Sequence, residues 1–155
     1  MPMPGAFDRR HGWRLFLHPA FRATFDRLVT EVAELGRARP EDYRSHSKAK
    51  LLRRIVDLIL YEIPSDPASP RYRQGTTLGG VHPHWRRAKF LGRFRLFFRY
   101  SEKDRIIIYA WINDGSTLRK AGSRSDPYEI FKQRLRRGDP PDSWDDLMRE
   151  AGSKR

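Results

Sequence analysis

Residues 94–100 read Phe-Arg-Leu-Phe-Phe-Arg-Tyr, an alternation that few structures other than a β-sheet accommodate. Because successive strand residues point to opposite sides, the run predicts a strand with one apolar face. Segments at residues 85–90 and 105–112 flank it, and residues 101–104 have the length of a hairpin loop. We therefore expect these three neighbouring segments to form an antiparallel sheet.

The same alternation predicts what each face of the sheet carries. We expect a core-facing side made of Ala88, Phe90, Phe94, Leu96, Phe98, Tyr100, Ile106, Ile108, Ala110 and Ile112. The opposite side then carries the four cations Arg87, Lys89, Arg95 and Arg99. Phe97 and the outward residues of the third strand, Ile107, Tyr109 and Trp111, share that side. Like charges side by side destabilise a sheet, so an anion bound there would explain the cluster. The plain alternative is a solvated basic face.

Helical periodicity surrounds the three strands. The spacing predicts a helix over residues 21–35 that ends at Gly36, and a second over 45–63 that Pro64 closes. Further elements are expected as a strand at 13–17, helices at 126–137 and 143–150, flexible residues 1–11, and an acidic helical extension over 139–155. These elements predict one α+β domain over residues 1–155, with an antiparallel sheet of about four strands packed against N-terminal helices.

The charge of the chain is concentrated in its middle. The 155 residues carry a net charge of +13, and residues 71–137, with 17 basic and five acidic side chains, account for +12 of it. Such a patch favours polyanionic partners. The absence of cysteine excludes disulfides, thiolate zinc sites and a thiol nucleophile. The longest apolar run, residues 106–112, is too short to span a membrane, and no leader opens the chain, so we expect a cytoplasmic protein without a membrane partner.

Several separate motifs stand out along the chain: residues 85–90, 92–102, 111–114 (Trp-Ile-Asn-Asp), 117–119 (Thr-Leu-Arg) and 137–141 (Arg-Gly-Asp-Pro-Pro) with Trp144. Together they resemble the YhaV family of bacterial toxins. The resemblance covers about residues 12–150 and implies a RelE-like fold and an mRNA endoribonuclease that acts on the ribosome without a cofactor or metal. It also implies a PrlF-type antitoxin, an AbrB-like swapped-hairpin DNA-binding protein that neutralises the toxin and represses the operon with it.

The resemblance also implies roles for individual residues. Cleavage would follow attack of a ribose 2′-hydroxyl on its own 3′-phosphate, which requires charge stabilisation and proton transfer. Arg87, Arg95 and Arg119 are the expected electrostatic clamps, Lys89 a further charge or the base, and Tyr128 the tyrosine beside the scissile phosphate. The expected RNA-binding residues are His84, Arg86, Arg93, Arg99, Trp111, Asn113 and Lys120.

Each of these hypotheses has an alternative. Tyr128 suits packing on the sheet equally well. Trp111 or Tyr109 could stack a base, but both suit packing better. Asn113 and Asp114 could orient a ribose or a basic partner. The second helix carries the cations Lys48, Lys50, Arg53 and Arg54, which would form either a solvated face or a contact with ribosomal RNA. His82 and His84 suit an acid–base pair, but have no further zinc ligands nearby. The acidic extension either shields the basic face or only packs against the rest of the protein. At the level of function, the rivals are a gyrase-targeting toxin of the same fold and a non-catalytic RNA- or DNA-binding protein.

Overall fold

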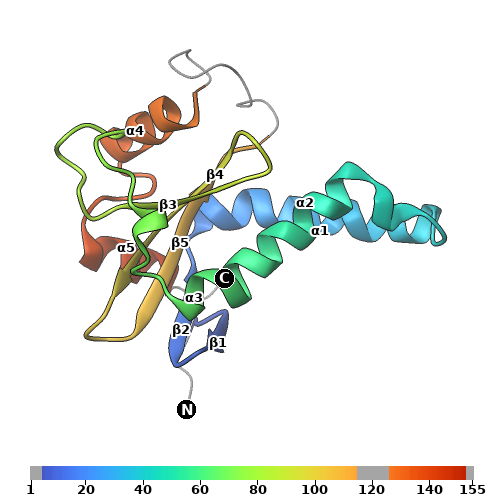
Figure 1. The fold of residues 1–155 in the computed structure, drawn as a ribbon, viewed down its shortest axis with the longest axis horizontal. Helices are drawn as coiled ribbons and strands as arrows, with labels where there is room; N and C mark the ends of the chain where they lie inside the picture. Colours follow the sequence, from blue (N-terminus) through green and yellow to red (C-terminus); the bar gives the residue numbers. More distant parts are fainter. Residues whose placement is uncertain (1–4, 115–125, 153–155) are drawn as a thin grey trace.

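The chain folds around a five-stranded mixed β-sheet (Figure 1). The structure, a computed structural model, describes residues 5–114 and 126–152. The strand order is β1-β2-β5-β4-β3, in which β2 runs parallel to β5 and the other neighbours are antiparallel. The strands are β1 (Asp8–Arg10), β2 (Trp13–Leu17), β3 (Arg86–Phe90), β4 (Phe94–Ser101) and β5 (Ile106–Ile112).

The α+β class is confirmed, but the sheet differs from expectation in two ways. The N-terminal residues expected to be flexible contain β1, which pairs with β2 and extends the sheet by one strand. The sheet is also not purely antiparallel, because Arg14 to Leu17 pair in parallel with Ile106 to Tyr109. Parallel strands need a long crossover connection, and the helices and strands between β2 and β5 supply it.

Helices α1 (Pro19–Ala38), α2 (Ser47–Asp57) and α3 (Ile63–Ser65) pack on one side of the sheet. His18 caps α1, since its Nδ1 accepts the Ala20 N–H at 2.9 Å. Gly36 does not end α1 as expected, because the backbone N–H of Arg39 caps the helix on the Leu35 carbonyl, 2.7 Å away.

The helix expected over residues 45–63 is divided into shorter pieces. A 3-10 turn at Tyr43–Ser45 precedes α2, and a π-helical turn at Leu58–Glu62 joins α2 to α3. Pro64 lies inside α3 instead of closing the helix, which its place in the first turn of α3 permits, because no N–H is required there.

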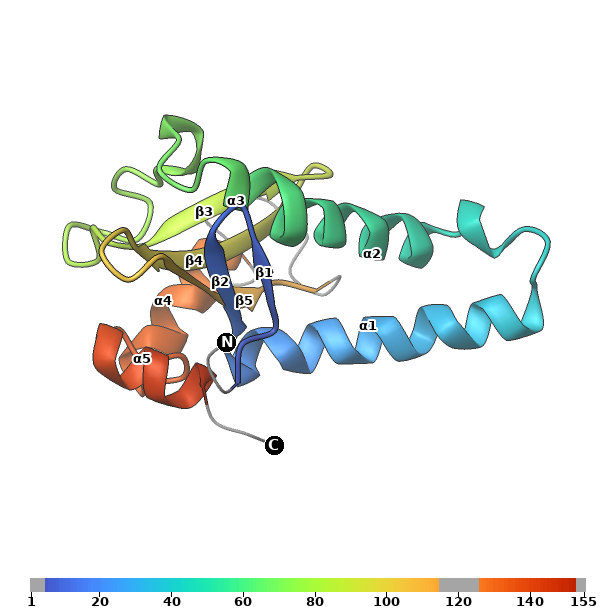
Figure 2. The same cartoon turned by 90° about the horizontal axis from the view of Figure 1, so that it is seen from below.

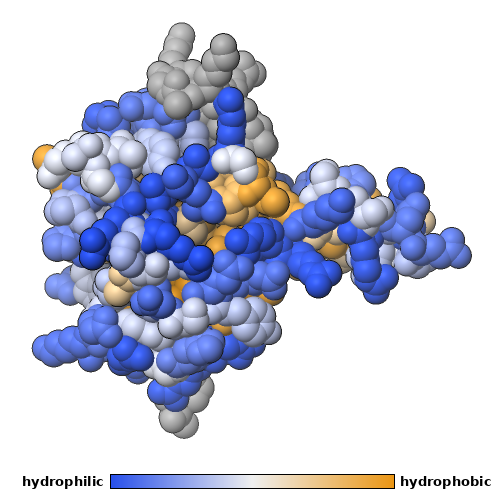
Figure 3. Space-filling view, viewed as in Figure 1, coloured by the Kyte–Doolittle hydropathy of each residue, from blue (hydrophilic) through white to orange (hydrophobic). Residues whose placement is uncertain are grey.

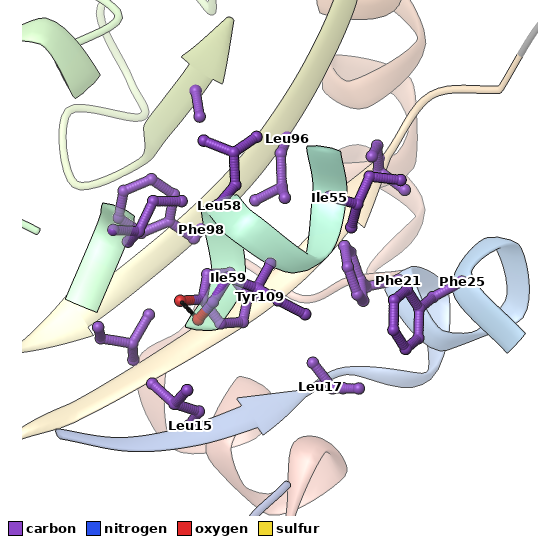
Figure 4. Packing of buried hydrophobic residues seen from close by; sticks show 14 of the residues in the cluster. Leu15, Leu17, Phe21, Phe25, Ile55, Leu58, Ile59, Leu96, Phe98 and Tyr109 are labelled. Carbon is purple, nitrogen blue, oxygen red and sulfur yellow. Dashed lines mark hydrogen bonds between the residues drawn. The ribbon is translucent and has the colours of Figure 1, made fainter. Parts of the chain in front are cut away.

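The core on this side joins the helices to the sheet (Figure 4). Phe21 and Phe25 of α1 stack at a centroid distance of 5.6 Å, and the hydroxyl of Tyr109 donates to the carbonyl of Ile59 at 2.7 Å. Burial raises the pKa of Tyr109 well above its ordinary value. The Tyr109 bond satisfies a carbonyl within the π-helical turn, where regular helical hydrogen bonding is interrupted.

The other side of the sheet is covered by α4 (Pro127–Arg137) and α5 (Trp144–Ala151) (Figure 2). Asp126 caps α4, Gly138 ends it in the left-handed conformation at φ 78°, and Ser143 caps α5. Phe131 stacks on Phe97 of β4 with a centroid distance of 4.1 Å. The face expected to be basic and open is therefore partly a second apolar core.

Within β5 the predicted faces of Trp111 and Ile112 are confirmed, but those of residues 106–110 are wrong, for this reason and for a second one. All seven residues of β5 are buried, because helices cover both sides of the sheet. Phe97 pairs with Trp111 and Phe98 with Tyr109, so Ala110 is an extra residue in a β-bulge that reverses the alternation. The core with α1–α3 receives Ile107, Tyr109 and Ile112, and the core with α4 and α5 receives Ile106, Ile108, Ala110 and Trp111. The faces predicted for β3 and β4 are confirmed.

The hairpin of α1 and α2 extends away from the sheet as a helical arm, residues 29–54 (Figure 1). No α1 residue beyond Leu28 is buried. A groove of about 380 Å³ lies where the arm meets the strand ends, and Figure 3 shows apolar side chains gathered there. Among the described residues, no helix combines the length and apolar character needed to cross a membrane.

Candidate active site

Two strands and one helix bring Arg87, Arg95 and Tyr128 together. In the β3–β4 ladder, Arg87 lies opposite Phe97 and Lys89 lies opposite Arg95, so these cations share the face that α4 covers. Asp126 fixes the start of α4 by accepting the Tyr128 N–H at 3.0 Å. The cap therefore determines which residue of the first helical turn lies over the two arginines.

The hydroxyl oxygen of Tyr128 lies between the two guanidinium groups. It accepts the Nε–H of Arg87 at 2.8 Å and the Nε–H of Arg95 at 3.1 Å. Arg87 is buried and also donates to the Arg71 carbonyl at 3.1 Å. Arg95 donates from Nη1 to the carbonyls of Gly92 and Phe94, each at 2.9 Å. We call Arg87, Lys89, Arg95 and Tyr128 the central cluster.

Several hydrogen-bond donors of the central cluster have no acceptor among the described protein atoms. The Tyr128 hydroxyl accepts from both arginines, so its own proton is left to be donated to a third group. The Nη2 group of each arginine bonds to no described protein atom, and Lys89 is exposed. No described acidic side chain forms an ion pair with these cations. A donor set of this kind suits an anion with several oxygens.

Asn113 has a structural place instead of the expected RNA-facing one. It is 1% exposed; its Oδ1 accepts the Arg95 N–H at 2.8 Å and its Nδ2 donates to the Arg93 carbonyl at 3.1 Å. Both polar ends of the amide are thus used to hold the backbone beside Arg95. The side chain of Arg93 is exposed, and Asp114 pairs with Arg27 at 3.8 Å.

The two aromatic candidates for base stacking are buried. Trp111 stacks on Phe97 and Phe131 at centroid distances of 5.9 and 5.7 Å, and Tyr109 lies in the other core. Neither ring has a face open to a nucleotide, so the packing alternative is correct for both. Their burial follows from the cover that α4 and the N-terminal helices give to the sheet.

Arg99 is half-buried and holds the C-terminal segment. Its guanidinium lies 5.7 Å from the ring of Trp85 and 5.6 Å from that of Trp144, and Nη1 donates to the Asp142 carbonyl at 2.5 Å. Burial lowers the pKa of Arg99. The extension that carries Asp142 and α5 therefore packs on the sheet at Arg99.

His82 and His84 do not form a pair. His82 Nδ1 lies 3.0 Å from Asp142 Oδ1, which also accepts Trp85 Nε1–H at 2.7 Å, whereas His84 is exposed. The His82–Asp142 contact ties the loop before β3 to the C-terminal segment. Across residues 5–114 and 126–152, no group of three potential metal ligands among His, Cys, Asp and Glu comes together.

The remaining predicted residues lie elsewhere. Arg86 points to the face opposite Arg87, over the ring of Tyr100 at 5.7 Å. The cations of α2 lie on the helical arm, where Lys48 pairs with Glu31 at 3.5 Å and Arg54 pairs with Glu62. Arg119 and Lys120 fall outside the described residues.

Two contributors to the central cluster escaped the sequence interpretation. The Arg71 carbonyl holds Arg87, and no sequence signal identifies a single backbone acceptor. The predicted helix began at Asp126, but the role of its side chain in orienting Tyr128 was missed. The position of Asp126 directly before Pro127 is a recognisable N-cap signal that could have revealed this role.

Comparison with known proteins shows to which family the chain belongs. Residues 15–152 match a family described as a toxin with endonuclease activity, of a toxin–antitoxin system. The ribonuclease toxin YhaV of Escherichia coli (strain K12) is 46% identical over 146 residues, covering 93% of this chain and 95% of that protein. Toxin YhaV of Escherichia coli O157:H7 shows the same identity and coverage. No solved structure gives a significant match.

These matches define the class of protein as an endonuclease toxin of a toxin–antitoxin system, and therefore as an enzyme. The chain belongs to the YhaV toxin family. A toxin of such a system implies an antitoxin partner.

Proposed function

We propose that this toxin is an endoribonuclease that cleaves mRNA on the ribosome, with its central cluster as the active site. The observation that carries the proposal is the Tyr128 hydroxyl held by the Nε–H groups of Arg87 and Arg95. Two guanidiniums with free donors fit the oxygens of a phosphodiester, and the phenol adds a proton donor. Relatives that are 46% identical include one named a ribonuclease toxin, which supports RNA as the substrate.

The proposed reaction is attack of a ribose 2′-oxygen on the adjacent phosphorus. The bond from phosphorus to the 5′-oxygen of the next nucleotide breaks, which gives a 2′,3′-cyclic phosphate and a 5′-hydroxyl end. Arg87 and Arg95 stabilise the charge that develops on the phosphorane oxygens. The donor set of cations and a phenol suits an anion and offers no carboxylate to a divalent metal, so the proposed chemistry is metal-independent.

Proton transfer is divided between two groups in this proposal. Tyr128 donates its proton to the 5′-oxygen as that oxygen leaves, because the arginines already occupy its lone pairs. Lys89, exposed and opposite Arg95, either accepts the 2′-hydroxyl proton as the neutral amine, or stays charged and stabilises the phosphorane while water accepts that proton. Arg119 remains a proposed third clamp.

The proposed partners follow from family membership and the resemblance. We propose a PrlF-type antitoxin that neutralises the toxin and binds operator DNA with it, and a cytoplasmic site of action on translated mRNA. The +12 charge of residues 71–137 supports a polyanionic substrate, because long-range attraction raises the rate of encounter with RNA.

The test is cleavage by purified toxin of an mRNA bound to ribosomes, with mapping of both product ends. Wild-type toxin is expected to leave cyclic phosphate and 5′-hydroxyl ends, and antitoxin to suppress them. Arg87→Ala should abolish cleavage, whereas Arg136→Ala, at an exposed position of α4, is the matched control with normal activity. Full activity of a folded Arg87→Ala protein would contradict the site, and binding without cleaved product would favour the non-catalytic alternative.

A further inference from the structure

A second pair of arginines meets at the edge of the sheet, on the side away from the central cluster. Arg73 and Arg86 lie opposite each other in an isolated antiparallel bridge at the outer edge of β3. Directly opposed side chains lie on the same face, so the two cations are neighbours. Such a like-charged pair destabilises a sheet edge unless something neutralises it.

The surroundings of this pair supply no neutralising group. Within the described part of the chain, neither Arg73 nor Arg86 forms an ion pair with an acidic side chain. Arg73 is exposed. Arg86 donates from Nη1 to the carbonyls of Pro83 and Trp85, at 3.1 and 3.4 Å, and its buried Nε has no partner. Backbone carbonyls and the Tyr100 ring thus fix the Arg86 guanidinium, while its positive charge remains uncompensated.

The charge of Arg86 also acts on its neighbours. Burial is the main cause of the lowered pKa of Arg99; Asp142 raises this pKa, and Arg86 lowers it by less than Asp142 raises it. Asp142 pairs with His82 and forms no ion pair with Arg73 or Arg86. The two residues therefore combine an exposed cation with a fixed cation, an arrangement that favours a bound anion.

The pair is connected to the central cluster through a short piece of backbone. The Arg71 carbonyl accepts a hydrogen bond from Arg87, and two residues later Arg73 bridges to Arg86. Arg86 and Arg87 are also consecutive in β3 and point to opposite faces. A strand of RNA that passes over the β3 edge can therefore contact both places with neighbouring phosphates.

We propose that Arg73 and Arg86 form a second phosphate-binding site, which holds the RNA backbone beside the nucleotide cleaved at the central cluster. The site rests on the proposed ribonuclease function. It contributes affinity for RNA in any sequence, because guanidiniums on phosphates position the chain and do not read bases. It has no part in the bond-breaking step.

The test measures binding and turnover separately, with the purified full-length toxin. The binding probe is a single-stranded RNA with 2′-O-methyl riboses, which lacks the attacking hydroxyl and stays intact. Arg73→Gln is expected to weaken binding about three- to tenfold and to reduce the slope of log affinity against log salt by about 0.7, the value for one phosphate contact on a single strand. At saturating cleavable RNA, the turnover rate should stay within about twofold of wild type. Arg37→Gln, on the helical arm, is the matched control.

Charge reversal separates RNA binding from a merely structural role. In Arg73→Glu the new carboxylate faces Arg86 across the bridge, so the melting temperature is expected to rise while RNA affinity falls further than in Arg73→Gln. A structural role would instead lower both quantities. The proposal is overturned if Arg73→Gln and Arg73→Glu bind RNA with wild-type affinity and salt slope, even where they bind the antitoxin less well. Failure of the ribonuclease proposal itself is recognised separately, when wild-type toxin binds ribosome-bound mRNA without producing cleaved ends.

Discussion

The side-chain amide of Asn113 closes the end of the β4–β5 ladder by accepting the backbone N–H of Arg95 at 2.8 Å and donating to the carbonyl of Arg93 at 3.1 Å. Beyond Ile112, paired with Leu96, the two strands have no regular partner, so a side chain takes the place of backbone pairing. Arg95 thereby enters the central cluster from a fixed piece of backbone.

Replacing Asn113 by alanine is expected to lower both stability and cleavage. The change leaves a backbone N–H and a carbonyl without their partners, which costs about 1–3 kcal/mol of unfolding free energy. Cleavage should fall more than RNA affinity, since Arg95 loses its position and not its charge. Urea denaturation and single-turnover cleavage measure the two effects. Asp114→Ala is the adjacent control, and equal stability of Asn113→Ala and wild type would contradict the prediction.

Replacing Tyr128 by phenylalanine is expected to reduce cleavage by at least about 100-fold while α4 stays folded. The ring still packs edge-on against Phe97, 5.7 Å away, but no proton donor remains for the leaving oxygen. An RNA whose scissile 5′-oxygen is replaced by sulfur needs no acid, because a thiolate leaves readily. This substrate should restore most of the lost rate to Tyr128→Phe. If the sulfur substrate is cleaved as slowly as the oxygen one, Tyr128 does not act as the acid.

Replacing Arg99 by alanine is expected to loosen the C-terminal segment. The variant loses the bond to the Asp142 carbonyl and the packing between Trp85 and Trp144, which together stabilise the fold by about 1–3 kcal/mol. Hydrogen exchange of the α5 amides should accelerate, while RNA affinity stays close to that of wild type. Arg136→Ala serves as the control. Slow exchange in α5 together with weakened RNA binding would return Arg99 to the RNA-binding residues.

Burial of Tyr109 predicts a loss of stability at alkaline pH. Its pKa is raised in the folded state, so its contribution is fully present below about pH 10, the pKa of an unfolded tyrosine, and declines as the pH rises above it. Tyr109→Phe should make this decline shallower, although Tyr72, whose pKa burial also raises, retains part of it. Urea unfolding between about pH 8 and pH 11 measures the slope. Identical slopes for variant and wild type would contradict the assignment.

The local elements were predictable because their signals are local. Alternation identified β3 and β4 and their faces, and Gly138 and Ser143 marked the end of α4 and the start of α5 as capping residues do. The convergence of Arg87 and Arg95 also followed from period two. Their contact with Tyr128 was suggested by a family resemblance, since nothing local places the first turn of α4 over that face.

The errors arose where distant parts of the chain decide the structure. The bulge at Ala110 depends on how β5 registers with β4, and an uninterrupted apolar strand does not reveal which residue is extra. The cover by α4 and α5 buried Trp111 in a core, and the half-buried Arg99 holds the C-terminal segment through Trp144 and the Asp142 carbonyl. The parallel pairing of β2 with β5 joins Arg14 to Ile106, and no short-range pattern records such a pairing.

That pairing has a consequence for the order of events during synthesis. The central strand β5 separates β2 from β4, so a nascent chain that stops before Ile106 can complete neither the N-terminal half of the sheet nor the frame that holds Arg95. Tyr128 is added later still. Contacts between such distant segments also form slowly. A ribosome that synthesises this toxin therefore carries a chain without an assembled central cluster for most of the time it spends on the message.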